Sequence, residues 1–305
     1  MPRLWIIYTE KDKITMKYKS LTLQDIETIR PFYRMIQSRT CDYTVGGMFM
    51  WRDFYKMEYA IEDGTFFSRL RDQNNNIYYN IPVSEDIHAS ICRLITSEGK
   101  RLRFCTVPEE YLPVFLNCGS DTVISEQADY FDYLYCAADL VLLRGKKYNG
   151  QRNLISQFKR SVDAWSFEMI DSNSINHVKD FFYNTYLPFS KEGPFEQEEN
   201  KKVIEVLDNF DTYGMVGGYL IADGKIVGFS INEIVGDTLY THIEKADRQY
   251  KGAYQMLVNQ AAITFAVDEV SFINREEDMG DLGLRTSKKS YHPIELLKKY
   301  TIEVG

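Results

Sequence analysis

The pattern of hydrophobic and polar positions predicts a series of helices and strands, and the same order of elements occurs in both halves of the chain. Residues 22–37 have apolar side chains at helical spacing, and the ranges 56–61 and 65–71 flank Asp63-Gly64, a dipeptide typical of a β-hairpin turn. The first half is further expected to contain a strand at 77–83, a helix from Ser84 to Gly99, a strand at 101–107, a short helix at 109–116 and a strand or hairpin at 122–143.

The second half of the chain repeats this order of elements. Its pattern predicts a strand at 165–170, helices at 173–186 and 196–210, strands at 217–222, 225–234 and 238–245, a helix at 253–267, a strand at 270–274 and a last apolar run at 294–304. Hairpins followed by a helical crossover are typical of α/β (α+β) domains with a mixed, mostly antiparallel sheet flanked by helices. We therefore expect two tandem domains, at residues 16–145 and 146–305, after a tail at 1–15.

Composition and net charge limit which kinds of molecule the chain is expected to bind. With 305 residues and a net charge of −8, the chain has no overall field that favours DNA or an anionic membrane, so a phosphate-bearing partner needs a local basic patch. Five cysteines without CxxC spacing argue against a disulfide framework and a structural zinc site, and four scattered histidines add no metal motif. A reducing, cytoplasmic location and no metal are expected. No apolar run reaches the length of a transmembrane helix.

The strand at 238–245 has a polar face. Alternation places Tyr240, His242 and Glu244 together on one side of it. A central strand with helices on both sides is normally apolar on both faces, so this face predicts a cleft. The alternative is a hydrogen-bonded edge or a subunit contact.

A glycine-containing loop follows that strand and opens the next helix. Gly252 allows close approach of a ligand, the helix start offers free N–H groups, and Arg248 and Lys251 add positive charge, a combination that suits phosphate. The run Gln249-x-x-Gly252-x-Tyr254 resembles the GNAT acetyltransferase signature Gln/Arg-x-x-Gly-x-Gly/Ala, with Tyr254 where that signature has a small residue. The expected donor-binding residues are Arg248, Gln249, Lys251, Gly252, Ala253 and Tyr254.

A charged segment begins where the strand at 270–274 ends. Its residues read Asn-Arg-Glu-Glu-Asp-Met-Gly at 274–280, then Gly-Leu-Arg at 283–285 and Lys-Lys-Ser-Tyr at 288–291. Such a run is a ligand site at a strand end, or a solvated face held by ion pairs. The three motifs resemble a bacterial family of unknown function that is related to the C-terminal domain of phosphatidylglycerol lysyltransferase, and the resemblance extends from about Met16.

A basic segment joins the two halves. Between Arg144 and Arg160 there are six basic residues and no acidic one, which makes a patch fit for phosphates in an otherwise acidic chain. The alternative is a basic helix that packs against the acidic helix at 196–210. The residues expected in this patch are Lys146, Lys147, Arg152, Asn153, Lys159 and Arg160.

The resemblance implies a fold and an activity. The family and its FemABX relatives have tandem GNAT folds, and characterised relatives move amino acids from aminoacyl-tRNA. It therefore implies an acyl or aminoacyl transferase that uses aminoacyl-tRNA, or acyl-CoA as a co-substrate, to modify an amine acceptor directly, without a tightly bound cofactor. The alternative is a non-catalytic ligand-binding or regulatory protein on a degenerate GNAT scaffold, for which Tyr254 is the best support.

Direct transfer needs a base for the acceptor, donors for the oxyanion and an acid for the leaving group. Glu244 is the expected base and Tyr291 the expected acid. The full set of expected catalytic residues is Glu244, Tyr291, His242 and Glu277. The residues expected to orient substrate are Asn274, Arg275, Asp278, Arg285 and Lys288.

Overall fold

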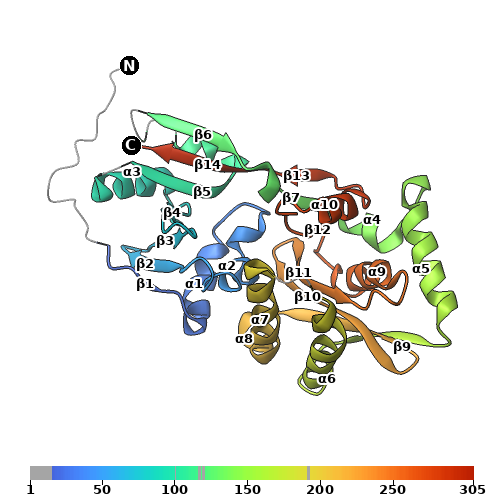
Figure 1. The fold of residues 1–305 in the computed structure, drawn as a ribbon. Helices are drawn as coiled ribbons and strands as arrows, with labels where there is room; N and C mark the ends of the chain where they lie inside the picture. The colour runs from blue at the N-terminus through green and yellow to red at the C-terminus, as the bar shows by residue number, and fades with distance from the viewer. Residues whose placement is uncertain (1–15, 100, 116–117, 119–120, 191–192) are drawn as a thin grey trace. The chain divides into compact units, whose positions relative to one another are not determined.

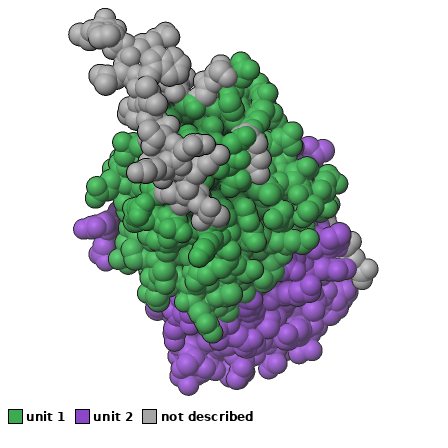
Figure 2. All heavy atoms as spheres, turned by 90° about the vertical axis from the view of Figure 1, so that its left-hand side faces the viewer, with its two compact units in different colours: residues 1–38, 52–128, 298–305 green, residues 39–51, 129–297 purple. Residues whose placement is uncertain are grey.

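The computed structural model describes residues 16–99, 101–115, 118, 121–190 and 193–305, and it divides into two compact units (Figures 1 and 2). Within the part described, unit 1 comprises residues 16–38, 52–128 and 298–305, and unit 2 comprises residues 39–51 and 129–297. The tail expected at 1–15 lies outside the described residues. The chain thus passes between the units more often than a single boundary at 145/146 allows.

Unit 1 is built on a seven-stranded sheet with the order β1-β2-β3-β4-β5-β14-β6 (Figure 1). Its strands are β1 (Lys19–Ser20), β2 (Glu58–Glu62), β3 (Thr65–Arg71), β4 (Ile77–Tyr79), β5 (Leu102–Pro108), β6 (Thr122–Glu126) and β14 (Lys299–Val304). Its helices are α1 (Ile26–Tyr33) and α3 (Ile87–Glu98), with 3-10 turns η2 (Leu23–Asp25) and η4 (Glu109–Phe115).

Local signals in this unit are confirmed. The β2–β3 hairpin turns at Asp63 and Gly64, whose φ angles of 48° and 74° are those of a turn that glycine favours. Helix α3 ends at Gly99, which has a φ of 61° and caps the carbonyl of Ile95. Pro31 lies inside α1, which is shorter than the helix expected at 22–37.

Unit 2 is built on a second seven-stranded sheet with the order β13-β7-β12-β11-β10-β9-β8. Its strands are β7 (Asp132–Cys136), β8 (Trp165–Met169), β9 (Val216–Ala222), β10 (Lys225–Val235), β11 (Thr238–Ala246), β12 (Phe272–Asn274) and β13 (Glu295–Leu297). Its helices are α2 (Val45–Phe49), α4 (Ala137–Leu142), α5 (Asn149–Ser161), α6 (Ile175–Phe181), α7 (Pro194–Asp208), α8 (Phe210–Tyr213), α9 (Ala253–Phe265) and α10 (Leu282–Lys289). Its 3-10 turns are η3 (Cys41–Tyr43), η6 (Lys146–Tyr148) and η8 (Leu187–Phe189), and η7 (Phe182–Tyr186) is a π-helical turn. The 3-10 turn η5 (Ala128–Tyr130) lies at the boundary between the units.

Both sheets are mixed and mostly antiparallel, as the sequence predicts, because one parallel pair interrupts each: β4 with β5 and β11 with β12. The protein is therefore an α/β protein with two sheets flanked by helices. Helix α9 covers the sheet of unit 2 and packs on α4 and α5, with Met256, Leu257 and Ala262 in the core beneath it (Figure 1).

Two segments that were each predicted as one unit are divided between the two sheets. Residues 122–143 do not form one strand or hairpin, because β6 and β7 belong to different sheets and α4 follows β7. The apolar run at 294–304 likewise supplies β13 to unit 2 and β14 to unit 1, where β14 pairs with both β5 and β6. Strand partners far away in the sequence decide these assignments, and a periodic pattern does not encode them.

None of the helices in the described part of the chain combines the length and apolar character that crossing a membrane requires.

Candidate functional site

Strands β11 and β12 separate soon after they pair. Their parallel pairing runs from Thr238/Phe272 to Tyr240/Asn274, and β11 then continues alone on that side to Ala246. The chain leaves β12 at Arg275, whose guanidinium Nη2 lies 2.5 Å from Glu244 Oε2. The divergence of the two strands is thus bridged by an ion pair between two residues that the sequence singled out.

The guanidinium of Arg275 has hydrogen-bonding capacity to spare. Its Nε and Nη1 atoms and the hydroxyl of Tyr291 are buried without a hydrogen-bond partner, and the guanidinium lies 4.8 Å from the centre of the Tyr291 ring. Burial raises the pKa of Tyr291, so its hydroxyl keeps its proton. Since an unpaired buried donor costs about 1–3 kcal/mol, these three donors together are suited to an incoming acceptor oxygen.

His242 lies between two carboxylates. Its Nδ1 is 2.6 Å from Glu276 Oε1 and its Nε2 is 3.2 Å from Glu233 Oε2. Burial alone would lower the pKa of His242, but the two carboxylates outweigh it and raise the pKa to about 10. An imidazolium with both nitrogens engaged is a poor general base near neutral pH, so His242 holds the site together.

The start of helix α2 completes this arrangement. The carboxylate of Glu233 accepts hydrogen bonds from the backbone N–H groups of Val45 and Gly46, at 3.1 and 2.7 Å. The His242 ring lies so close to Gly46 that a Cβ there would come within 2.2 Å of Nε2. Val45 and Gly46 therefore lie against Glu233 of β10 and His242 in the middle of β11.

The three side chains that were expected to line a cleft, those of Tyr240, His242 and Glu244, are buried or paired. Tyr240 is 2% exposed and His242 8%, and the Glu244 carboxylate is engaged by Arg275. The polar residues of this face bind one another and the returning segment 39–51, which a pattern within the strand cannot reveal. The face is the hydrogen-bonded arrangement that was the alternative, with Glu244 at its partly exposed end.

The charged segment after β12 forms a fixed loop. Lys288 donates from Nζ to the carbonyl oxygens of Arg275, Glu276 and Glu277, at 2.5, 3.1 and 2.5 Å, and burial lowers its pKa. Glu276 has a φ of 55°, so these contacts hold a conformation that costs free energy. Lys288 thus shapes the loop that positions Arg275.

Asp278 anchors the other end of this loop. It accepts from Tyr133 Oη at 2.6 Å and from Arg285 at 2.9 and 2.7 Å. Burial alone would raise the pKa of Asp278, but these donors lower it to about 2. Asp278 and Arg285 are therefore positioned to support the loop rather than to touch substrate.

Asn274 and Glu277 face a buried polar cluster. Asn274 Nδ2 donates to Asp132 Oδ2 at 2.9 Å, and Cys41 donates to the same oxygen through its backbone N–H at 2.7 Å. Cys41, Asp132 and Glu277 each offer one atom that a metal ion could bind, all within 4.8 Å of one another. Asp132 is fully buried and already engaged, so the cluster functions as a hydrogen-bonded core.

The loop expected to bind the donor, residues 247–254 (the donor loop), exposes two cations and packs against α5 through Gly252. Arg248, Gln249 and Lys251 are exposed. Gly252 has a φ of 91°, and a Cβ there would lie 2.1 Å from the carbonyl oxygen of Leu154 in α5. Glycine is thus required for the approach of two helices, and Ala253, the first residue of α9, is buried behind it.

Tyr254 lies where the GNAT signature has a small residue. It is partly buried, and burial raises its pKa to about 12. The Tyr186 hydroxyl interacts with it, and Lys245 lies over the Tyr186 ring. Tyr254 therefore fills space beside the donor loop.

Some residues of the basic patch make contacts within the fold, and others are exposed to solvent. Arg152 donates to the carbonyl oxygens of Leu143 and Gly145 and thereby closes the turn before α5, and Lys147 pairs with Asp139 at 2.9 Å. Lys159 lies over the ring of Trp165. Helix α5 packs on α9, and the exposed members of the patch are Lys146, Lys147, Asn153, Lys159 and Arg160.

Three parts of the candidate site were not predicted from the sequence. They are Glu233, the segment 41–46 and the pair Tyr133 and Asp132. Glu233 did carry a signal, because it is a carboxylate in strand β10, whose residues are mostly apolar. The segment 41–46 carries none, since its role depends on a contact with residues nearly 190 positions away.

A match to a family profile identifies the family of this chain. The profile of the family described as phosphatidylglycerol lysyltransferase, C-terminal, matches residues 33–303. This chain belongs to that family. The resemblance drawn from the motifs at 274–291 is thereby confirmed.

Solved structures share the whole fold. A conserved protein of unknown function from Bacteroides thetaiotaomicron is 28% identical with a TM-score of 0.84, and the match covers 95% of this chain and 100% of that one. L-PGS from Bacillus licheniformis is 14% identical with a TM-score of 0.62, covering 91% of each chain. FemX is 9% identical with a TM-score of 0.57, covering 94% of this chain and 97% of the other. The expected α/β fold of two mixed sheets flanked by helices is thus shared along almost the whole length of these structures.

A curated relative, an uncharacterised protein of Mycoplasmoides gallisepticum, is 25% identical over 180 residues. The match covers 57% of this chain and 56% of the relative, so it spans little more than half of each.

Proposed function

We propose that this transferase-family chain moves an amino acid from aminoacyl-tRNA directly to an amine-bearing acceptor. The observation that carries the proposal is the group of three unpaired buried donors, two on Arg275 and one on Tyr291, beside Glu244. A carbonyl oxygen that gains negative charge in the transition state is the acceptor that such donors stabilise best. Aminoacyl esters and thioesters both present one.

In the proposed step the acceptor nitrogen attacks the ester carbonyl carbon, the C–N bond forms, and the C–O bond to the ribose breaks. Glu244 receives the ammonium proton on the oxygen that Arg275 does not engage, and the Tyr291 hydroxyl gives a proton to the departing ribose oxygen. Arg275 holds the oxyanion. Glu277, Asp278, Arg285, Lys288 and Asn274 act by fixing the loop that carries Arg275.

The donor's phosphates would lie on exposed cations of unit 2. The packing of Gly252 on Leu154 brings Arg248 and Lys251 to the same part of the unit as α5, which carries Lys159 and Arg160. Exposed cations on two neighbouring elements suit the phosphates of tRNA. Tyr254 occupies space that the coenzyme A signature keeps small. Acyl-CoA is therefore the second choice of donor, and the cytoplasm, where charged tRNA occurs, is the proposed location.

A non-catalytic ligand-binding role is the second candidate function. It is favoured by the pairing of two expected catalytic groups, His242 with two carboxylates and Glu244 with Arg275. In that case the donors on Arg275 and Tyr291 would bind an acyl or aminoacyl group without turnover.

Transfer of a radiolabelled amino acid from charged tRNA tests the proposal. Acceptor arms are a free amine, aminophospholipid vesicles and vesicles of phosphatidylglycerol, the hydroxyl acceptor in the family's name. We expect label on an amine acceptor, a loss of at least about a hundredfold in Glu244→Gln, and no change in Glu269→Gln, an exposed acid of the same unit.

The outcomes separate the candidates. Full activity in Glu244→Gln would remove the mechanism. Label on phosphatidylglycerol alone would keep aminoacyl transfer and reject the amine acceptor. Binding of charged tRNA or acyl-CoA with no transfer in any arm would favour the non-catalytic role.

A further inference from the structure

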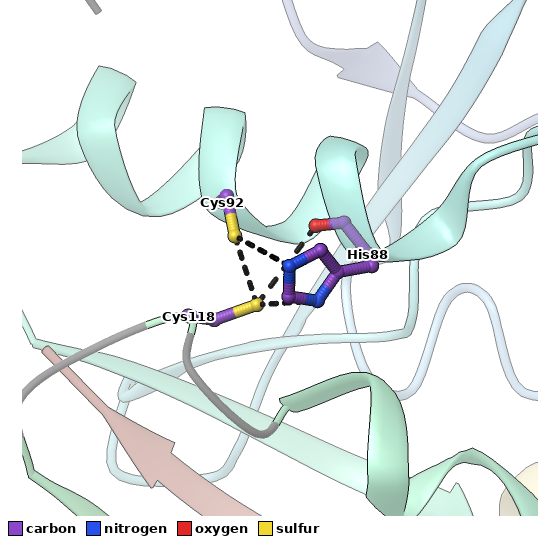
Figure 3. Close-up of side chains that lie close together, drawn as sticks. All are labelled: His88, Cys92 and Cys118. Carbon is purple, nitrogen blue, oxygen red and sulfur yellow. Dashed lines mark hydrogen bonds between the residues drawn. The ribbon is translucent and has the colours of Figure 1, made fainter. Parts of the chain in front are cut away.

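Three soft metal ligands converge in unit 1, outside the site described above. His88 and Cys92 lie one turn apart on the same face of α3, and Cys118 comes from the segment between η4 and β6 (Figure 3). Cys92 Sγ lies 2.9 Å from Cys118 Sγ and 3.7 Å from His88 Nε2. One ligand atom from each residue lies within 4.8 Å of the other two.

The histidine is held in the form that a metal needs. His88 Nδ1 lies 2.7 Å from the carbonyl oxygen of Val114, which can only accept, so Nδ1 carries the proton and Nε2 presents a lone pair. A ligating histidine usually donates its other N–H to a carbonyl or carboxylate in this way. The nitrogen that remains free, Nε2, lies 3.7 Å from Cys92 Sγ, while Cys118 Sγ lies 3.3 Å from Nδ1.

The thiols are poised as well. The Cys118 thiol donates to Cys92 Sγ at 2.9 Å. Thiolate is the form of cysteine that binds metal. A metal ion would replace the proton that the two sulfurs share.

The spacing of Cys92 and His88 already matches that of ligands on a tetrahedral zinc ion, whereas the spacing of Cys92 and Cys118 does not. With Zn–S of about 2.3 Å and Zn–N of about 2.0–2.1 Å, tetrahedral angles place sulfur about 3.5 Å from nitrogen and sulfur about 3.8 Å from sulfur. The Cys92–His88 distance of 3.7 Å is close to this value. The sulfurs, at 2.9 Å, would need to move apart by about 0.9 Å.

We propose that His88, Cys92 and Cys118 bind a zinc ion in unit 1. Two thiolates and one imidazole favour a borderline-soft ion over magnesium or calcium. His88 is exposed, so the fourth position is open to water or to an outside ligand. The ion would join α3 to Cys118, which lies between η4 and β6 in the chain.

This proposal replaces the expectation of no metal. That expectation rested on the absence of CxxC spacing, whereas these ligands are a His-x-x-x-Cys pair on a helix and a cysteine 26 residues later. The proposal is independent of the transferase function, because the cluster and the transferase residues belong to different units.

Zinc binding by the full chain, stripped of metal and kept reduced, tests the site. Competition with a chromophoric chelator should show one tightly bound zinc per chain, and cobalt should give a thiolate-to-metal charge-transfer band. We expect affinity to fall about a hundredfold or more in Cys92→Ser and Cys118→Ser and clearly in His88→Ala. Cys105→Ser and His177→Ala are the matched controls, and circular dichroism checks that each variant folds.

Two results would overturn the proposal. One is zinc affinity in the double variant Cys92→Ser/Cys118→Ser equal to that of the unaltered chain. The other is a chain that binds no zinc after reduction but forms a Cys92–Cys118 disulfide with an added thiol oxidant such as oxidised glutathione. That second outcome would assign the pair to redox chemistry, since a disulfide needs no third ligand.

Discussion

The imidazole of His242 is enclosed by the carboxylates of Glu233 and Glu276 and by the backbone of Gly46. At the scale of single residues, this enclosure changes the chemistry of the side chain. An isolated histidine titrates near neutral pH, but His242 remains an imidazolium well above it. It thereby becomes a fixed charge that holds α2 and the loop after β12 to β11.

The pH dependence of stability should report this charge. A histidine with a folded pKa of about 10 and an ordinary value of 6.5 stabilises the fold fully below about pH 6.5 and loses that contribution as pH rises toward 10. We expect the free energy of unfolding in urea to fall across this window. His242→Gln should flatten the fall, whereas the exposed His177→Ala should not. Equal slopes in all three proteins would contradict the assignment.

Gly46 should tolerate no side chain. A Cβ at this position would come within 2.2 Å of the His242 ring, so Gly46→Ala should cost about 1–3 kcal/mol through overpacking. Gly150→Ala in α5 meets nothing within 4 Å and should stabilise by up to about 1 kcal/mol. Chemical denaturation of both variants checks the contrast, and a neutral Gly46→Ala would show that the segment is not pressed against His242.

Strand β14 shows what governs the structure at the scale of elements. It follows β13 by one residue, yet β13 is an edge strand of one sheet while β14 lies between β5 and β6 in the other (Figure 1). Ile302 is fully buried there, whereas Ile294, in the same apolar run, is 52% exposed. The apolar run was predictable from its composition. Its division into one strand for each of the two sheets was not.

The two isoleucines make a matched pair for measurement. Ile302→Ala removes methyl groups from a closed core and should destabilise unit 1 by about 2–5 kcal/mol. Ile294→Ala should change stability by less than about 0.5 kcal/mol. Hydrogen exchange should show the loss for Ile302→Ala in β5 and β6 specifically. Unchanged protection of these strands would mean that β14 is not central to the sheet.

At the scale of the whole molecule, an acidic chain carries exposed cations on α5, at Lys159 and Arg160, and on the loop before α9, at Arg248 and Lys251. A net charge of −8 repels nucleic acid at long range, so tRNA binding would depend on these local contacts. Such contacts release counterions, which gives affinity a measurable dependence on salt.

The salt dependence of tRNA affinity should identify the contacts. We expect log Kd to rise linearly with log salt concentration, and Lys251→Gln to reduce the slope by about 0.7–0.9, the value for one phosphate. Lys225→Gln, an exposed lysine at the start of β10, is the control and should leave the slope unchanged. A flat salt response in the unaltered chain would point to acyl-CoA as the donor.

The sequence by itself determined the parts that depend on neighbours along the chain. The Asp63-Gly64 hairpin, the end of α3 at Gly99 and the motifs at 274–291 are local, since turn geometry and helical periodicity need only a few adjacent residues. Those motifs also sufficed to identify the family.

Only the tertiary structure decided what the polar residues do. It paired Arg275 with Glu244, enclosed His242 beneath residues 39–51, and brought Cys118 to His88 and Cys92. The contacts of Cys92 with Cys118 and of Gly46 with His242, for example, join residues 26 and 196 positions apart. A hydrogen bond or ion pair depends on distance in space, and a single sequence contains no periodic trace of such a distance.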